Sequence, residues 1–450
     1  MSQHSIGRRQ FLARTSAAAL LSRFGLMNAA AQTATTATDY KALVCIFLQG
    51  GNDGHNTIIP GSGTALAAYK SARGSLALPD ANTTILPVVD AATGNPYGLN
   101  GGLTSLQPLW GQGKLAFIAN MGTLVKPVTR AQYLSNAVPV PTNLFSHPDQ
   151  VQAVQSCIPS SSGGTGWGGR VADAIQSLNG AATFPTTCSI AGPALFCTGN
   201  AIQSAALLPG FNLDASGMQL WPQAAADGRK LGLQNVLKFN SGLSVVQAAN
   251  KTRQDAMDLN AMLTGAAASI TTTFPGTTLG VQLKQVASIM SLRATTGMKR
   301  QVFFCSLGGF DTHSGQSWQQ FDLLRQVSDA LLAFYQSTIA MGISDKVTSF
   351  TLSDFGRTLQ PSGSGCDHGW GSHHLILGDA VKGGNLYGKF PDLSLGGPDD
   401  SGSRGAMIPS TSMDQFAATL ALWLGVPAAS LPTVLGNIGN FGVSNLGFLG

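Results

Sequence analysis

Four short apolar runs, each leading toward a loop rich in Gly, Asp, Ser or His, most constrain the fold of this chain. The runs are ALVCIFLQ at 42–49, KLAFIAN at 114–120, QVFFCSL at 301–307 and KVTSFTL at 346–352. Near-continuous apolarity over so few residues is typical of strands that are buried on both faces of a sheet. These runs therefore predict the central strands of a covered sheet.

Segments with helical periodicity lie between and after the strand-like runs. They span 245–263, 279–292, 318–341 and 412–424, the last with Ser412 as a candidate N-cap. Strands that alternate with helices predict an α/β fold, a three-layer sandwich with a largely parallel central sheet. No linker, repeat or charge block divides the chain, so we expect one domain over 39–450. The stretch at 184–275 has no His and few acidic residues, and we interpret it as a structural insertion or a cap.

The N-terminus has the features of an export signal. A twin-arginine motif, RRQFL at 8–12, precedes an Ala/Leu-rich stretch and a plausible cleavage site at Ala29–Ala31. We therefore predict a twin-arginine signal peptide at 1–34, recognition by the twin-arginine translocation machinery, and a periplasmic or secreted protein. The alternative is an amphipathic N-terminal helix. No later segment has 18 consecutive apolar residues, so we expect no transmembrane segment in the mature protein.

The charge balance excludes one class of partner. The chain has 26 Lys and Arg against 21 Asp and Glu, but four of the arginines lie in the predicted signal peptide. The mature chain is therefore close to neutral. This predicts no basic patch of the kind that nucleic-acid or anionic-membrane binding needs.

The histidines are few, and all those beyond the predicted signal lie in Gly-, Asp- or Ser-rich segments near the ends of apolar runs. They are His55, His147, His313, His368, His373 and His374. Imidazole and carboxylate together are the ligand set of a divalent metal such as zinc or manganese. Ligands of α/β proteins bind beyond the carboxyl ends of the strands. We therefore predict a site for one or two divalent ions, gathered from loops distant in sequence.

The candidate metal ligands each have a simpler alternative. They are Asp53, Asp311, His313, Asp354, Asp367, His368 and His373. Asp53 alternatively forms an Asp-Gly turn, Asp311 with His313 a local Asx-turn, and 367–374 a solvated loop. Asp354 either binds metal directly or orients a histidine that does.

Two further residues are candidates for catalysis. Ser146 precedes a helical segment at 148–155, where a helix N-terminus favours negative charge on a nucleophile. Arg357 suits a phosphate or sulfate group, because its guanidinium binds such groups in a bidentate manner. The alternatives are an N-cap for Ser146 and a structural salt bridge for Arg357.

Motifs along the whole mature chain resemble a large bacterial family of twin-arginine-exported proteins, domain of unknown function 1501. The motifs are IFLQGGNDG at 46–54, FSH at 145–147, GWGGR at 166–170, GGFDTHSGQ at 308–316, SDFGRT at 353–358, DHGWGSHH at 367–374, VKGGNLYGKFP at 381–391 and SMDQ at 412–415. The family is similar in fold to the alkaline phosphatase and sulfatase superfamily, so the resemblance implies an alkaline-phosphatase-like sandwich with one or two divalent metals.

The resemblance also implies roles for particular positions. Asp53, then Asp311 with His313, then Asp354 or Asp367 with His368, then His373 or His374 match the superfamily's metal ligands in order. Ser146 matches its nucleophile by position. One departure is Phe355, because superfamily members often carry Asp-His at that strand end. Either Asp367-His368 supplies the missing imidazole, or the second metal is absent.

These observations predict an exported metal-dependent hydrolase of phosphate or sulfate esters, acting on a small-molecule or polymer ester. The nucleophile would be a metal-activated Ser or water. The alternative is a non-catalytic envelope binding or assembly protein on a degenerate phosphatase-like scaffold. A third option is a metal-dependent transferase that acts on envelope lipids or glycans.

Overall fold

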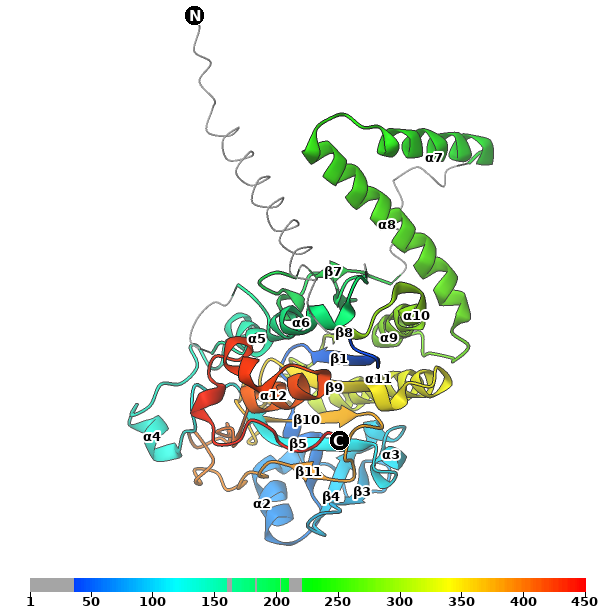
Figure 1. Cartoon of the computed structure of the whole chain (residues 1–450). Coiled ribbons are helices and arrows are strands. Elements are labelled where there is room, and N and C mark those ends of the chain that lie inside the picture. The colour runs from blue at the N-terminus through cyan, green and yellow to red at the C-terminus, as the bar shows by residue number, and fades with distance from the viewer. Residues whose placement is uncertain (1–35, 160–163, 183, 203, 210–220) are drawn as a thin grey trace, which may run out of the picture.

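The computed structural model describes residues 36–159, 164–182, 184–202, 204–209 and 221–450 (Figure 1). The predicted signal peptide at 1–34 lies outside these residues. Within the described ranges, no helix is both long and apolar enough to cross a bilayer.

A largely parallel sheet forms the centre of the molecule, which confirms the predicted α/β class. Its strands run in the order β11-β5-β10-β9-β1-β8-β6-β7, with β12 beside β5. The pairs are parallel except the two that β10 makes, with β5 and with β9. The strands are β1 (Lys41–Leu48), β5 (Leu115–Gly122), β6 (Thr187–Ser189), β7 (Ala205–Ala206), β8 (Arg300–Leu307), β9 (Val347–Ser353), β10 (Ser372–Leu377), β11 (Leu386–Tyr387) and β12 (Thr411–Ser412).

Helices cover both faces of this sheet, and a small antiparallel sheet lies apart from it (Figure 1). The small sheet holds β2 (Ile58–Pro60), β4 (Pro96–Asn100) and β3 (Ile85–Val89). The α-helices are α2 (Gly63–Arg73), α3 (Gln107–Gly111), α4 (Arg130–Leu134), α5 (His147–Ser156), α6 (Trp167–Ile175), α7 (Gln223–Lys238), α8 (Ser244–Ser269), α9 (Thr278–Ser291), α10 (Arg293–Thr296), α11 (Gln316–Ala340), α12 (Met413–Leu424) and α13 (Leu431–Val434). Short 3-10 turns connect several of them, at Gly54–Asn56, Gly74–Leu76, Gly101–Leu103, Gln176–Asn179, Leu195–Cys197, Ser344–Lys346, Ala428–Ser430 and Ile438–Asn440.

The molecule has two apolar cores, one on each face of the central sheet, and the side chains of β1 point alternately into them. Val44 and Ile46 point into one apolar cluster, with residues of α3, α9 and α11. Cys45 and Phe47 point into the other, with residues of α5, α6, α12 and α13. Because successive side chains of a strand face opposite ways, a strand in the middle layer must be apolar at every position. The run at 42–49 was predictable for this reason.

The predicted elements and the structure agree at most boundaries. The four predicted strands correspond to β1, β5, β8 and β9, and the four predicted helices correspond to α8, α9, α11 and α12. Ser412 caps α12, since its hydroxyl accepts a hydrogen bond from the backbone of Gln415. Strand β10 was not predicted, and it places His373 and His374 on a strand instead of a loop.

The segment interpreted as an insertion or a cap, 184–275, is not uniform. Its first part contributes β6 and β7 to the edge of the central sheet. Its second part forms α7 and α8, a helical hairpin that stands away from the sheet (Figure 1, green). Cys188 and Cys197, in this first part, are both buried free thiols.

Truncation of Ile46 tests the two-sided core. Ile46 is fully buried at the centre of the sheet, so Ile46→Ala should lower the free energy of unfolding by about 2–5 kcal/mol, from lost burial and the cavity left behind. The same change at Ile339, which is 50% exposed on α11, should cost under about 0.5 kcal/mol. Denaturant unfolding followed by circular dichroism measures both. Equal losses would contradict this account of the core.

Candidate metal centre

The carboxyl ends of three neighbouring strands carry the candidate site. In the sheet β1 lies between β8 and β9 and pairs with both in parallel. The loops after these strands therefore leave the same edge side by side. His147 joins them from the first turn of α5.

Gly50 and Gly51 let the loop after β1 pass closely between the loops of its neighbours. Their φ angles are +115° and +85°, which favour glycine. A Cβ atom on Gly50 would lie 2.4 Å from the backbone nitrogen of Asp311. One on Gly51 would lie 2.5 Å from the ring of Phe355. Larger residues here would force the loops apart.

Three side chains from different loops converge on one point. One ligand atom each of His147, Asp311 and His368 lies within 4.8 Å of the other two. Asp311 Oδ1 is 3.4 Å from His147 Nε2 and 3.6 Å from His368 Nε2. Ligands at 2.0–2.1 Å around a tetrahedral zinc lie roughly 3.3 Å from one another. The spacing therefore fits a divalent ion.

Both imidazoles are held with Nε2 toward this point. His147 Nδ1 lies 2.7 Å from Asp354 Oδ2, and His147 Nε2 is buried without a hydrogen-bond partner. His368 Nδ1 lies 2.6 Å from the carbonyl oxygen of Phe145. An acceptor at Nδ1 places the proton there and leaves the Nε2 lone pair free to bind metal. Asp354 thus contacts a histidine of the cluster, as its second predicted role would require.

The charge states also suit metal binding. Partial burial lowers the pKa of His368, with help from the positive charge of Arg357, so the ring stays neutral. Partial burial opposes ionisation of Asp311, but a hydrogen bond and the charge of Arg357 outweigh it and lower the pKa of this carboxyl. A neutral imidazole and an ionised carboxylate are the forms that bind metal.

A second group of polar residues surrounds the exposed side of the cluster. His313 Nε2 is 3.1 Å from Asp311 Oδ1 and 3.0 Å from His368 Nε2. His313 Nδ1 is 3.6 Å from Asp367, which in turn binds Arg404. The side chains of Arg404 and His313 are 42% and 46% exposed, so the cluster opens to solvent here.

Arg357 connects the loops after β1 and β8 to the segment before His368. Its guanidinium is fully buried and donates to the carbonyl oxygens of Gly50, Gly51, Phe310 and Cys366. It also binds Asp311 Oδ1 at 2.6 Å. Nε donates to Gly51, the two N–H groups of Nη2 are shared by Gly50, Phe310 and Asp311, and Nη1 donates to Cys366 and lies 3.4 Å from His313 Nε2. All its donors therefore face groups of the protein. This leaves Arg404 as the guanidinium at the cluster that solvent reaches.

Asp53 lies apart from the cluster, in a buried ion pair. Its carboxylate binds the guanidinium of Arg73, and both side chains are fully buried. Arg73 comes from the end of α2 and also donates to the carbonyl oxygens of Thr358 and Leu359. Asp53 therefore has a permanent cation beside it, at the position where the family resemblance implies a metal.

His373, His374 and Ser146 are also not brought into the cluster. His373 Nδ1 accepts a hydrogen bond from the backbone of Asn120, and its ring stacks on Phe390. Complete burial lowers the pKa of His374 to about 4. The hydroxyl of Ser146 donates to Asp149 Oδ2 at 2.5 Å, within the first turn of its own helix.

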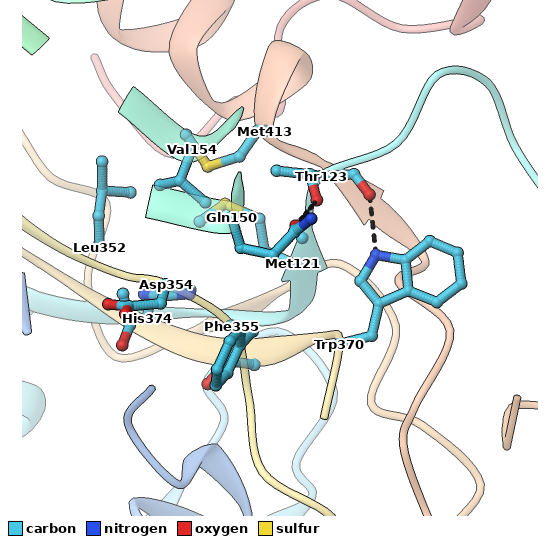
Figure 2. Close-up of a pocket in the computed structure, with 13 residues that line it drawn as sticks. Met121, Thr123, Gln150, Val154, Leu352, Asp354, Phe355, Trp370, His374 and Met413 are labelled. Atoms are coloured by element: carbon cyan, nitrogen blue, oxygen red, sulfur yellow. Dashed lines mark hydrogen bonds between the residues drawn. The ribbon is translucent and has the colours of Figure 1, made fainter. Parts of the chain in front are cut away.

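Figure 2 shows a small cavity that Asp354, the partner of His147, helps to line. Asp354, Phe355, His374 and Trp370 are among the side chains that line it, and the indole of Trp370 donates to the carbonyl oxygen of Thr123. Its volume is about 10 Å³, which holds roughly one water molecule. An ester substrate therefore has to approach from the solvent side of Asp311 and His313.

The sequence places His147 among the six histidines expected near the site, but it is not among the seven predicted metal ligands. The available signal was its place among the six loop histidines. Its partner Asp354 is 207 residues away in the sequence, so the chain alone gave no reason to prefer it over His373.

The fold is a largely parallel α/β sandwich, and a His–Asp cluster lies at the carboxyl edge of its sheet. The chain is therefore an α/β protein with a candidate metal centre. A family described as "Protein of unknown function (DUF1501)" matches residues 40–428. The chain belongs to this family, which confirms the resemblance seen in its motifs. No curated protein sequence matches the chain.

Several solved structures are similar in fold at very low sequence identity. The lipoteichoic acid synthase LtaP from Listeria monocytogenes is 9% identical, with 88% of this chain and 77% of that chain covered and a TM-score of 0.36. A protein in the alkaline phosphatase superfamily from Vibrio parahaemolyticus is 11% identical, with 87% and 68% covered and a TM-score of 0.35. The C-terminal periplasmic domain of EcEptC from Escherichia coli, in complex with Zn, is 8% identical, with 77% and 75% covered and a TM-score of 0.33.

Asp354→Asn tests how His147 is oriented. The amide nitrogen would donate to His147 Nδ1, so the ring proton would move to Nε2 and block metal binding. We expect zinc affinity to fall about 10–100-fold, as for other residues behind metal ligands. Asp345→Asn, which changes an exposed carboxyl at the opposite end of β9, should leave the affinity unchanged. Calorimetric titration with zinc measures both, and an unaltered affinity in Asp354→Asn would refute the arrangement.

Proposed function

We propose that this protein is an exported hydrolase of phosphate or sulfate esters that depends on one divalent ion, zinc or manganese. The observation that carries the proposal is the convergence of His147 Nε2, Asp311 Oδ1 and His368 Nε2 on one point open to solvent. Two neutral imidazoles and a carboxylate are the ligands of catalytic zinc sites, which keep a further position for water or substrate.

Each part of the proposed site has a separate task. A divalent ion held by these three residues supplies a Lewis acid and lowers the pKa of water. Asp354 and the carbonyl group of Phe145 hold the two imidazoles in place. Arg404, half-exposed beside Asp367, binds the non-bridging oxygens of the phosphate or sulfate group. Solvent access from the same side suits a substrate that is a small ester or part of a polymer.

We infer one ion rather than two because of Asp53 and Arg73. A carboxylate in a buried ion pair with a guanidinium has its charge already neutralised. Arg73 and Gln316 both bind Oδ2 of Asp53, so a second divalent ion would have only Oδ1 of this carboxylate, beside a guanidinium that further hydrogen bonds hold in place. Phe355 stands where a second imidazole would be needed, in agreement with this inference.

Water is the proposed nucleophile. The hydroxyl of Ser146, the residue before the first turn of α5, donates a hydrogen bond to the side chain of Asp149 in that turn. Since its neighbour His147 is the residue that enters the cluster, Ser146 serves this helix start instead of attacking the ester.

A non-catalytic envelope binding protein is the second candidate function. The Asp53–Arg73 pair and Phe355 favour it, because both remove ligands that a two-ion hydrolase would use. Such a protein would keep one structural ion and bind a polymer without cleaving it.

Metal content and ester hydrolysis, measured together, test the proposal. Elemental analysis of the purified protein should find about one zinc or manganese per chain. Asp311→Asn should lower metal affinity by more than about 100-fold, since even residues behind the ligands matter 10–100-fold, and abolish hydrolysis of p-nitrophenyl phosphate or sulfate. Asp53→Asn is the matched control: it should keep the ion while losing about 3–5 kcal/mol of stability.

Three outcomes would decide against parts of this account. Loss of the ion in Asp53→Asn, with the fold intact by circular dichroism, would place Asp53 among the ligands. Loss of hydrolysis in Ser146→Ala, with metal retained, would make Ser146 the nucleophile. A bound ion with no hydrolysis of any ester in the wild type would favour the binding protein.

We further propose that the twin-arginine pathway exports the protein to the periplasm or beyond. The support is the RRQFL motif at 8–12 and the short apolar stretch after it. Arg8→Lys with Arg9→Lys should retain the chain in the cytoplasm, seen by fractionation and immunoblotting. Arg14→Lys with Arg23→Lys, which changes two arginines of the same segment outside the motif, should be exported normally. Export of the first pair at the wild-type level would exclude this pathway.

A further inference from the structure

The hairpin of α7 and α8 has no role in the candidate metal centre. It stands away from the α/β body in Figure 1. At its base, Leu259 and Leu263 of α8 pack against the core beside α9. Farther out, the amide of Asn250 on α8 donates to the carbonyl oxygen of Val236 on α7 at 3.4 Å, which ties the two helices together. The far end of this arm is therefore an ordered structure that faces solvent.

The far end of the arm carries an unusual number of exposed apolar side chains. Of the 17 large apolar side chains exposed in the described part of the chain, seven lie between 221 and 246. They are Trp221, Leu231, Val236, Phe239, Leu243, Val245 and Val246. Phe239 and Leu243, at the turn between the helices, are 67% and 63% exposed. Scattered single residues would need no explanation, but a group this dense marks an interaction surface.

The arm also carries a net positive charge, because residues 223–269 contain five Lys or Arg against three Asp. Residues 228–254 contain five Lys or Arg and no Asp or Glu. The basic residues are Arg229, Lys230, Lys238, Lys251 and Arg253. The mature chain as a whole is close to neutral, which predicted no basic patch. The net charge does not reveal the local excess of positive charge in the arm, because acidic residues elsewhere in the chain balance it.

We propose that the tip of the α7–α8 arm docks on the surface of an anionic lipid bilayer. Apolar and aromatic side chains that alternate with Lys and Arg on a helix suit the boundary between headgroups and acyl chains. The basic residues are attracted to anionic headgroups. A second copy of this chain fits less well, because two tips of the same sign would repel each other. The arm lies on the bilayer without crossing it, in keeping with the lack of a spanning helix among the described residues.

This docking would hold the α/β body close to substrates in the membrane or envelope. The docking proposal does not depend on the proposed hydrolysis, because no residue of the arm belongs to the metal cluster. The two proposals can therefore fail separately.

Sedimentation of the mature protein with lipid vesicles tests the proposal. The protein should sediment with vesicles of phosphatidylglycerol and phosphatidylcholine, less so with phosphatidylcholine alone, and less at high salt. Phe239→Ser with Leu243→Ser, and separately Lys230→Glu with Lys238→Glu, should each weaken binding by about tenfold or more. Because these side chains are partly or largely exposed, the fold, checked by circular dichroism, should not change.

Matched variants elsewhere on the surface separate docking by the arm from general charge attraction. Lys284→Glu with Lys389→Glu makes the same change in net charge, and Leu395→Ser with Val443→Ser removes exposed apolar side chains far along the chain. Both should bind vesicles like the wild type. Equal losses in arm and control variants, or no binding by the wild type, would overturn the proposal. So would a concentration-dependent dimer in sedimentation velocity that only the arm variants abolish, since the arm would then bind a second copy.

Discussion

The buried guanidinium of Arg357 is the interaction on which the candidate site depends. It joins carbonyl groups of the loops after β1 and β8 to the segment just before His368, and it binds Asp311 as well. A charge without partners would be very costly at this depth, so the loops can close only in an arrangement that supplies all these acceptors. Gly50 and Gly51 provide two of them, because their backbone approaches where a side chain would not fit.

A second buried arginine sets the character of the site. Arg73 takes the carboxylate of Asp53, while Arg357 leaves Asp311 half-exposed and near three imidazoles. Two carboxylates at the ends of neighbouring strands thus have different surroundings, one within a dry ion pair and one at the surface. This division is the physical basis for the proposal of a single ion.

Much of the fold could be predicted because its signals are local. A strand buried on both faces must be apolar throughout, so β1 and β8 were evident, and Ser412 with Gln415 marked the start of α12. Strand β10 was missed because its first three residues, Ser372, His373 and His374, resemble loop residues. The candidate site was predicted as a set of loops and residue types, yet His147 was not chosen as a ligand and Asp53 was.

The amino-acid sequence alone determined the fold class, the edge of the sheet where polar loops gather, and the family, because apolar periodicity and motif order are properties of short segments. Only the tertiary structure decided which carboxylate lies half-exposed among imidazoles and which is fully buried in an ion pair. The contacts concerned join residues hundreds of positions apart, such as His147 with Asp354. It also separated the basic, apolar arm from a nearly neutral chain, since net charge does not reveal where charges lie in space.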